Sequence, residues 1–316
     1  MTKLEQAIQK LKSGEVVGIP TETVYGLAAS INSSKGIDAI FETKERPFFD
    51  PLIVHVSSIE QAKNLVKSWP TVCDVLAKEY WPGPVTFILP KNDTVSEKIT
   101  SGLNTVGIRM PNHQLTINLI EQLGHPIAAP SANKFKKTSP TCADDVKNAF
   151  SDILVLDGGD CKIGIESTIL GIFENEILIY RPGMTTKSEI EKNLSKNKIS
   201  LEVNYQESPV APGHLKHHYM PNIPVITSVG DTNSLSSSHI PENHLKKIVQ
   251  WKLPKSATIA ARELYSKFRE LDSNGATAIN IMLSESQFQD ENFKGILNRL
   301  IKASSYTLPK ELSNKS

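Results

Sequence analysis

The stretch from Gly14 to Val56 constrains the fold of this chain more than any other, because it holds two short apolar runs with polar residues between them. The runs Val16–Ile19 and Leu52–Val56 are rich in β-branched side chains and are bounded by Gly or Pro, which predicts two buried strands. Hydroxyl groups follow the first run, and the cations Lys44 and Arg46 precede the second. Open α/β sheets commonly hold small anionic ligands at strand ends, so the stretch predicts a ligand site as well as part of a sheet.

Apolar runs and amphipathic segments continue along the chain without strict alternation. Further strands are expected at Val85–Leu89, Val106–Met110, Ile127–Ala129, Ile153–Leu156, Thr168–Phe173 and Ile177–Tyr180. Helices are expected from Leu4 to Leu11, around Ile37–Phe41, and at Ile59–Leu65, Val72–Tyr80, Leu115–Leu123 and Ala143–Phe150, the last of them capped by Thr141. This mixture predicts an α/β domain over residues 1–194 whose sheet is mixed rather than purely parallel.

The composition changes after this domain. Residues 195–224 are polar and contain four prolines, which predicts an inter-domain linker. Over residues 225–316 the strands Val225–Thr227 and Ala278–Met282 alternate with the helices Ala257–Leu271 and Ile296–Ala303. That alternation predicts a small Rossmann-like α/β domain, with a polar tail after Tyr306 that is expected to fray.

Composition also excludes several classes of protein. The formal net charge of the 316 residues is +1, which argues against a protein that binds nucleic acid through its overall charge. Cys73, Cys142 and Cys161 are far apart and have no zinc-binding spacing, so neither a disulfide scaffold nor a structural zinc site is expected. No signal peptide and no membrane-spanning apolar run are recognised, so a cytoplasmic protein is expected.

The sequence lacks the familiar nucleotide-binding and hydrolase motifs. The pair Gly159–Gly164 has the spacing of a Walker A loop but not the Lys and Ser or Thr that must follow, and neither G-x-S-x-G nor H-E-x-x-H occurs. A nucleotide would therefore be held by scattered cations, hydroxyls and backbone amides. Arg109 and Arg181 each end an apolar strand and need an anionic partner, which a structural ion pair could also supply. Lys44 and Arg46 project to one side of an extended segment, or else form a solvated helix end.

Each of the other polar residues, taken alone, could have either a structural role or a role in ligand binding. A histidine inside an apolar strand, such as His55, is more often a satisfied core residue than a ligand. Single hydroxyl and amide residues at strand ends are ordinary in turns and caps, but as a set they could bind a small polar molecule. The set comprises Thr21, Thr23, Ser131, Asn133, Ser139, Ser167 and Thr168. The loop with Lys134, Lys136 and Lys137 is better explained as a solvated surface than as an RNA contact.

A series of short motifs runs through the chain. PTETVYGL, K-x-R-P and PLIVHV come first, then WPGPVTFIL, VGIRMP, APSAN, GIEST and YRPG, and a linker that ends in HHYMP. Together they resemble the YrdC/Sua5 family, the threonylcarbamoyl-AMP synthases, over nearly the whole chain and in the family's order. The segments ARELYSKFRELD and NRLIKAS resemble the Sua5 C-terminal domain. The resemblance implies a YrdC-like twisted mixed sheet with helices, followed by that smaller domain.

The resemblance also implies which residues form the site. The L-threonine pocket would contain Thr23, His55, Arg109, Ala129 and Ser167. ATP would be contacted by Lys44, Arg46, Asp50, Ser131, Asn133, Ser139 and Arg181, with Thr105 close by and His218 from the linker motif. Lys44 and Arg46 would be the catalytic residues. Many relatives have Asn in place of Asp50 and a cation in place of His217, so the roles of these two residues stay open.

The implied activity is the synthesis of L-threonylcarbamoyladenylate from L-threonine, bicarbonate or CO₂, and ATP, for the modification of adenosine 37 in tRNA. Mg²⁺ would accompany ATP, and tRNA or proteins of the later modification step would be partners. The linker from Ser208 to Pro221 is expected to close over the site as a lid, through His217, His218 and Tyr219. Two alternatives remain: a YrdC-like module that binds RNA without chemistry, and a related enzyme that uses carbamoyl phosphate.

Overall fold

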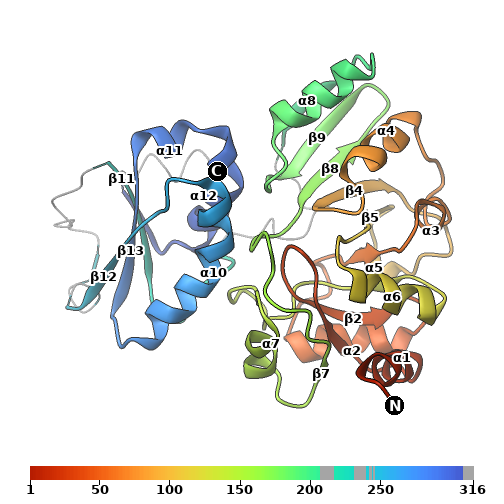
Figure 1. Ribbon diagram of the computed structural model, residues 1–316, viewed down its shortest axis with the longest axis horizontal. Coiled ribbons are helices and arrows are strands. Elements are labelled where there is room, and N and C mark those ends of the chain that lie inside the picture. Colours follow the sequence, from red (N-terminus) through yellow and green to blue (C-terminus); the bar gives the residue numbers. More distant parts are fainter. Residues whose placement is uncertain (207–216, 231–239, 242–243, 245, 309–316) are drawn as a thin grey trace.

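The computed structural model describes residues 1–206, 217–230, 240–241, 244 and 246–308. These residues form two units, each built on its own sheet, and Figure 1 shows the smaller C-terminal unit beside the larger one. The larger unit has a ten-stranded sheet and the smaller a four-stranded sheet. The expected α/β fold class is confirmed. Within the described ranges, no helix has both the length and the apolar character that crossing a membrane requires.

The sheet of the larger unit is mixed, as the sequence predicts. Its strands lie in the order β10-β9-β8-β4-β5-β3-β6-β2-β1-β7. Their bounds are β1 Val17–Ile19, β2 Gly26–Ser30, β3 Ile53–His55, β4 Val85–Pro90, β5 Thr105–Arg109, β6 Ile127–Ala128, β7 Leu154–Val155, β8 Thr168–Ile172, β9 Glu176–Arg181 and β10 Glu202–Tyr205. The pairs β1–β7, β3–β5, β4–β8 and β9–β10 are parallel, and the other neighbours are antiparallel.

Amphipathic helices pack their apolar faces against this sheet and against one another. They are α1 Lys3–Lys12, α2 Ser34–Lys44, α3 Ile59–Lys63, α4 Thr71–Tyr80, α5 Glu97–Thr100, α6 Gln114–Leu123, α7 Ala143–Ala149 and α8 Lys187–Lys196. In α1, for example, Ala7 and Leu11 are fully buried at the i, i+4 spacing and share a core cluster with Leu119 and Ile120 of α6.

Several details of the larger unit differ from the sequence prediction, among them helices α5 and α8, which were not expected. Strand β2 was not expected, because its residues Gly26–Ser30 are small and all buried, so they show no alternation of apolar and polar side chains. The N-cap of α7 is Cys142 and not Thr141. The Asp145 carboxylate accepts hydrogen bonds from the backbone N–H groups of Thr141 at 2.8 Å and Cys142 at 3.2 Å, so the cap interaction comes from within the helix.

Strand β10 lies inside the segment 195–224 that the sequence predicts to be linker. It pairs in parallel with β9, from Glu202 opposite Glu176 to Tyr205 opposite Ile179. The buried side chain of Val203 joins the main core of the larger unit. The larger unit therefore extends at least to Tyr205 instead of ending at residue 194, while residues 207–216 of the expected linker lie outside the described residues.

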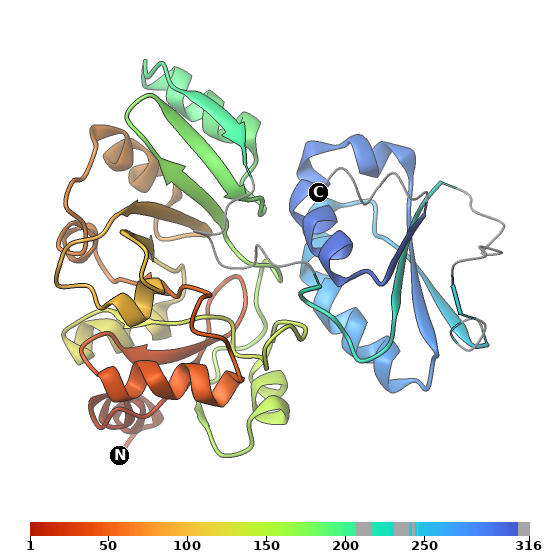
Figure 2. The same ribbon diagram turned by 180° about the vertical axis from the view of Figure 1, so that it is seen from behind.

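The smaller unit has the parallel sheet expected of a Rossmann-like domain. Its strands β11 Val225–Val229, β12 Ile248–Lys252, β13 Ala278–Leu283 and β14 Tyr306–Leu308 lie in the order β12-β13-β11-β14. The helices are α10 Ala257–Ser273, α11 Glu285–Gln289, the 3₁₀ helix η1 Glu291–Phe293 and α12 Lys294–Ala303. Helices α10 and α12 lie between this sheet and the larger unit in both views (Figures 1 and 2). Strands β12 and β14 were not predicted.

Candidate active site

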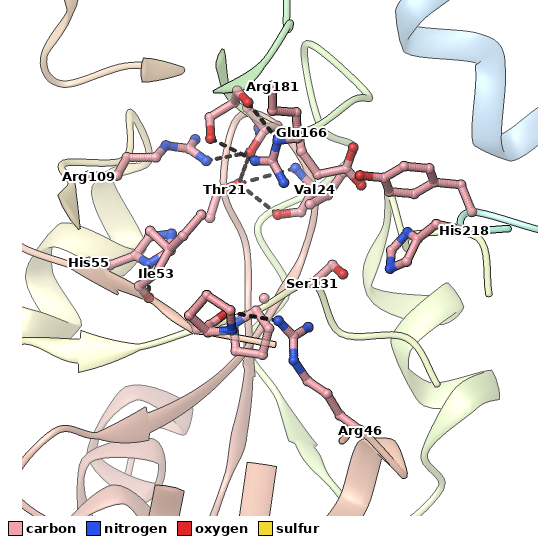
Figure 3. Close-up of a pocket in the computed structure, with 17 residues that line it drawn as sticks. Thr21, Val24, Arg46, Ile53, His55, Arg109, Ser131, Glu166, Arg181 and His218 are labelled. Carbon is pink, nitrogen blue, oxygen red and sulfur yellow. Dashed lines mark hydrogen bonds between the residues drawn. The ribbon is translucent and has the colours of Figure 1, made fainter. Parts of the chain in front are cut away.

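Several strands of the larger unit end at one cavity (Figure 3). Strands β3 and β5 are parallel neighbours with His55 directly opposite Arg109, so these two side chains enter the cavity together. The rest of the wall comes from the turn after β1, the loops before β3 and after β6, the residues before β8, the end of β9 and the segment with His218 and Tyr219. The lining residues are Thr21, Thr23, Val24, Gly26, Arg46, Pro51, Ile53, His55, Arg109, Ala129, Pro130, Ser131, Glu166, Ser167, Arg181, His218 and Tyr219.

All five residues expected to form the L-threonine pocket line this cavity: Thr23, His55, Arg109, Ala129 and Ser167. Arg109 is nevertheless already paired. Its Nη2 lies 2.7 Å from the Glu22 carboxylate, its Nη1 donates to Thr23 Oγ1 at 2.8 Å, and its Nε donates to the Gly83 carbonyl at 3.1 Å. The buried pair with Glu22 means that the cavity does not present Arg109 as an uncompensated cation.

His55 is a neutral imidazole in this site. Burial and the neighbouring Arg109 cation lower its pKa from 6.5 to about 3. Its Nδ1 lies 3.3 Å from the Ile53 carbonyl, which can only accept, so Nδ1 carries the proton and Nε2 is an acceptor. His55 therefore offers a ligand a hydrogen-bond acceptor without adding charge.

Ser167 and Arg181 form a linked pair in the same wall. Arg181 Nε donates to the Ser167 carbonyl at 3.1 Å, and its Nη2 donates to Ser167 Oγ at 3.1 Å. Ser167 Oγ also shares a hydrogen bond of 2.8 Å with Thr86 Oγ1. These hydrogen bonds therefore fix the distance between Ser167, which is expected in the L-threonine pocket, and Arg181, which is expected to contact ATP.

The residues expected around ATP divide into two groups. Arg46, Ser131, Arg181 and His218 line the cavity, whereas Lys44, Asp50, Asn133, Ser139 and Thr105 do not. Lys44 is buried, and its ammonium group donates to the carbonyl oxygens of Ser131, at 2.6 Å, and Asn133. Burial, with a smaller contribution from the Arg46 charge, lowers the Lys44 pKa well below its usual value. In this conformation Lys44 supports the loop that carries Ser131 instead of facing a ligand.

Asp50 acts as the counter-ion of Arg46. Arg46 Nη2 lies 3.0 Å from Asp50 Oδ2, and both side chains are buried. The same guanidinium donates to the Pro51 carbonyl at 2.8 Å and to the Asp50 carbonyl at 3.2 Å. Arg46 therefore also holds the turn that leads into β3. The role of the Asp50 side chain in this arrangement is to balance the charge of Arg46.

The other three residues lie outside the cavity for different reasons. Thr105 begins β5 and pairs with Pro90, whereas the cavity is at the Arg109 end of the strand, about 13 Å away at the usual rise per residue. Asn133 turns its amide back onto the carbonyls of Lys134 and Lys137. Ser139 donates its hydroxyl to Glu166 at 2.6 Å. The resemblance placed Thr105 near ATP, whereas the structure places it at the end of β5 away from this cavity.

Two carboxylates of the site were missed in the sequence. Glu22 and Glu166 stand inside the motifs PTETVYGL and GIEST, and both are buried. Burial raises the pKa of Glu166, but the charges of Arg299 and Arg181 outweigh it and lower the pKa to about 2. Because their arginine partners are distant in sequence, the only signal available was the presence of a charged residue inside each motif.

His218 and Tyr219 cover the cavity from the segment between the two units. Both are buried, and the neighbouring His217 is exposed. Burial lowers the pKa of His218 to about 3, so it too is neutral. Among the described residues, no hydrogen-bond partner is found for His218 Nδ1 or for the Tyr219 hydroxyl, which leaves both groups available to a ligand. The cavity offers about 60 Å³ to the centres of water-sized molecules, so ATP must either extend beyond it or displace this cover.

The acidic residues near the cavity do not form a metal site. In the described part of the chain, no three His, Cys, Asp or Glu side chains gather as metal ligands would. Glu22, Asp50 and Glu166 are each ion-paired with an arginine. The donor set of the protein therefore does not fit a resident Mg²⁺, whose usual ligands are one or two carboxylates, water and substrate phosphates.

Comparison with known proteins places this site in a family. Residues 9–183 match the family described as "Telomere recombination" (Sua5_yciO_yrdC), and residues 185–305 match "Threonylcarbamoyl-AMP synthase, C-terminal domain". The chain belongs to the Sua5/YciO/YrdC family. It is 36% identical to a threonylcarbamoyl-AMP synthase of Pyrococcus abyssi, covering 98% of this chain and 96% of that protein. It is 41% identical to the Bacillus subtilis threonylcarbamoyl-AMP synthase over 72% of this chain and 67% of that protein.

A solved structure extends the similarity to the whole fold. The crystal structure of P. abyssi Sua5 complexed with L-threonine has a TM-score of 0.83 and 32% identity, and the match covers 97% of this chain and 96% of that one. The resemblance that the motifs indicate is therefore confirmed for both units. The two Sua5 family regions meet at residues 183–185, whereas the ten-stranded sheet continues through β10 to Tyr205.

Proposed function

We propose that the protein is a threonylcarbamoyl-AMP synthase whose substrates are L-threonine, bicarbonate or CO₂, and ATP. The observation that carries the proposal is the composition of the cavity wall, where hydroxyls and a neutral histidine lie beside buried arginines. A small polar amino acid and a polyphosphate are ligands that such a wall fits. The similarity to threonylcarbamoyl-AMP synthases and to a Sua5 structure with bound L-threonine supports the same function.

The proposed reaction has two steps. The amine of L-threonine adds CO₂ and loses a proton, which gives a carbamate. A carbamate oxygen then attacks the α-phosphorus of ATP, and the bond from that phosphorus to the oxygen bridging to the β-phosphate breaks. Pyrophosphate leaves with the electron pair of the broken bond, and threonylcarbamoyl-AMP remains. Positioning and neutralisation of charge are the main demands that this transfer makes on a protein.

The side chains of the cavity meet these demands in separate ways. Arg46 and Arg181 neutralise phosphate charge, and their backbone contacts fix where those charges lie. Arg109, whose charge is compensated by Glu22, orients Thr23. His55 accepts a hydrogen bond from the amine or hydroxyl of L-threonine. Lys44 acts indirectly, by holding the loop of Ser131.

The proposed reaction also implies a metal cofactor, a tRNA modification that uses the product, and a cellular location. Mg²⁺ would arrive bound to the phosphates of ATP, because the site carboxylates are paired with arginines, and no step above depends on a metal held by the protein. The product would supply the threonylcarbamoyl group for modification of adenosine 37 in tRNA. Since ATP, L-threonine and tRNA meet in the cytoplasm, the activity is placed there.

The test is pyrophosphate release by the full-length protein. Release from ATP should require both L-threonine and bicarbonate, and the nucleotide product should carry the mass of threonylcarbamoyl-AMP. Release that needs neither co-substrate would contradict the proposal. Tight RNA binding with no release would instead favour an RNA-binding module, and release supported by carbamoyl phosphate would favour the related carbamoyl-transfer enzyme.

A further inference from the structure

Arg299 of α12 crosses from the smaller unit to the wall of the candidate active site. It is completely buried, and its side chain makes three contacts with the larger unit. Nε donates to the Glu166 carboxylate at 2.9 Å, Nη2 donates to the Glu166 carbonyl at 3.0 Å, and Nη1 donates to the Pro182 carbonyl. One guanidinium therefore ties together two loops that are sixteen positions apart in the sequence.

These two loops carry ligand-facing residues of the cavity. Glu166 lines the cavity and is followed directly by Ser167, and Pro182 follows Arg181. Arg181 is in turn bonded to Ser167 through both its Nε and its Nη2. Arg299 thus holds each of the two chain segments next to the residue that is expected to contact substrate.

Backbone packing fixes the helices of the smaller unit against the same loops. A Cβ added to Gly295, in the first turn of α12, would lie 2.5 Å from the Gly183 carbonyl oxygen. A Cβ added to Gly164 would lie 2.5 Å from the Ala261 carbonyl oxygen of α10. Gly164 also has a φ of +88°, which favours glycine. Contacts this close allow little room for the helices to shift without moving the loops of Glu166 and Arg181.

Groups from both units stabilise the negative charge of Glu166. Besides Arg299, its carboxylate accepts hydrogen bonds from Tyr265 of α10 and from Ser139 of the larger unit. Arg181 also lies close enough to stabilise its negative charge. Without Arg299, the Glu166 carboxylate would attract Arg181 more strongly and would compete with a phosphate for it.

We propose that Arg299 is a positioning residue of the active site, and that the smaller unit thereby builds the phosphate-binding end of the cavity. This inference rests on the proposed synthase function for the identity of the anionic ligand. Arg299 acts through Glu166, Ser167 and Arg181, and it neutralises the Glu166 carboxylate, which would otherwise compete with ATP for Arg181. A domain that served only as a tether or as a separate binding module would have no such effect.

The test compares full-length variants in ATP binding and in threonine-dependent pyrophosphate release. Arg299→Met should lower kcat/KM for ATP at least ten-fold and weaken ATP binding in calorimetry, with little change in L-threonine binding. Adding Glu166→Gln to Arg299→Met should recover much of the loss, because the uncompensated carboxylate is then gone. Glu291→Ala is the matched control: it removes inter-unit hydrogen bonds to Ser188 and Tyr205, neither of which lines the cavity, and should stay within two-fold of the unmodified protein.

A pH profile separates this role from loss of stability alone. The groups facing Glu166 are Arg299, Tyr265, Arg181, Tyr219 and His218. Removing Arg299 should raise the pKa of the buried Glu166 carboxyl, since burial then opposes its ionisation with less compensation. Protonation neutralises this carboxyl, so kcat/KM of Arg299→Met relative to the unmodified protein should rise as the pH falls from 8.5 to 5.5. The double variant should have no such rise.

Several outcomes would overturn the inference. Unmodified ATP kinetics in Arg299→Met would do so, as would a loss that Glu166→Gln does not relieve and that has the same pH profile as the unmodified protein. If Arg299→Met fails to fold, Arg299→Gln takes its place, because an amide can still donate a hydrogen bond to Glu166 but removes the positive charge; unchanged ATP affinity in that variant would also refute the role. ATP calorimetry needs no turnover, so it tests Arg299 even if the synthase reaction itself is absent.

Discussion

At the scale of residues, the site is a set of buried arginines that already have acidic partners. Arg46 pairs with Asp50, Arg109 with Glu22 and Arg299 with Glu166. A buried cation without a partner would cost several kcal/mol, so each acid makes the positive charge tolerable before a substrate arrives. Asp50, whose role the sequence left open, and the unpredicted Glu22 and Glu166 are therefore part of the anion site.

The first prediction concerns Arg46. Arg46→Ala should reduce threonine-dependent pyrophosphate release at least ten-fold, because a lost hydrogen bond to a charged group costs about 1.5–3 kcal/mol. The measurement is steady-state release, with thermal unfolding in parallel because Arg46 also holds the turn at Asp50 and Pro51. Lys67→Ala, at an exposed cation outside the cavity, is the control and should leave release unchanged. Near-normal turnover in a folded Arg46→Ala protein would remove Arg46 from the site.

The second prediction concerns the amino acid. The polar lining from Thr23, His55 and Ser167 should favour L-threonine over its isostere L-valine by more than ten-fold in kcat/KM. The physical reason is that valine leaves buried hydrogen-bonding groups unpaired. L-serine should lose less, since it lacks only a methyl contact. Comparable kcat/KM values for L-valine and L-threonine would mean that the site does not recognise the hydroxyl group of L-threonine.

At the scale of elements, the segment with His218 and Tyr219 determines how closed the site is. Its backbone is held on both sides: His218 N–H donates to the Lys302 carbonyl at 3.0 Å, and Met220 N–H donates to the Lys136 carbonyl at 2.8 Å. The Tyr219 ring packs 5.6 Å from the Arg299 guanidinium carbon and 5.8 Å from the Tyr265 ring. The segment therefore rests on the smaller unit while its side chains line the cavity of the larger one.

The third prediction is that this segment acts as a lid. His218→Ala and Tyr219→Ala should raise KM for ATP several-fold and increase the fraction of product that is hydrolysed to AMP, because a mixed anhydride survives best where water is excluded. L-threonine binding, measured by calorimetry, should change little. His217→Ala is the control, since His217 is exposed and does not line the cavity. Unchanged KM and unchanged product hydrolysis in both variants would rule the lid out.

Shortened chains test the lid less cleanly. A chain ending at Leu194 would lose β10 as well as the linker. Any chain ending before α12 would also lose Arg299 and leave the Glu166 charge without that partner. Point variants in the full chain avoid both side effects.

At the scale of the whole molecule, the two units share one interface that includes the site. Apart from the Glu166–Arg299 pair, Arg269 Nη2 lies 2.6 Å from Asp145, and Arg269 Nη1 donates to the Ser139 carbonyl at 2.9 Å. The smaller unit thus contacts the loops that carry the motifs GIEST and YRPG, and also the segment that follows APSAN. Activity and the docking of the two units should therefore be lost together.

The fourth prediction concerns stability against acid. The pKa values of His55 and His218 are lowered from 6.5 to about 3, so between these values the unfolded chain binds protons that the folded protein does not. The free energy of unfolding therefore decreases as the pH falls below about 6.5, by about 2 kcal/mol per histidine at pH 5.

Urea unfolding at pH 7.5 and pH 5.0 measures this effect. His55→Gln should show a smaller loss of stability between the two pH values than the unmodified protein, by the share of one histidine. His217→Gln, at an exposed position, is the control and should behave like the unmodified protein. A loss of equal size in His55→Gln would show that His55 does not contribute.

The sequence alone predicted ten of the fourteen strands that the structure describes, and its motifs indicated the family and, through that resemblance, the residues of the amino-acid pocket. Short β-branched runs bounded by Gly or Pro specify buried strands locally, and parallel neighbours such as β3 and β5 necessarily bring their ends together. The resemblance of their motifs assigned His55 and Arg109 to one site, and the parallel pairing of β3 and β5 is the physical reason that they meet there. Strand β2 escaped because small, wholly buried residues have no periodic pattern.

Only the tertiary structure decided where polar side chains find their partners. Lys44 turns to the carbonyls of a loop 87 and 89 positions away, and Glu166 meets Arg299 from 133 positions away. Neither separation leaves a periodic trace in the chain, because an ion pair depends on side-chain direction and on which loops the packing of the two units brings together. The same packing brings Arg299, a residue of a helix in the smaller unit, into contact with Glu166 of the cavity wall.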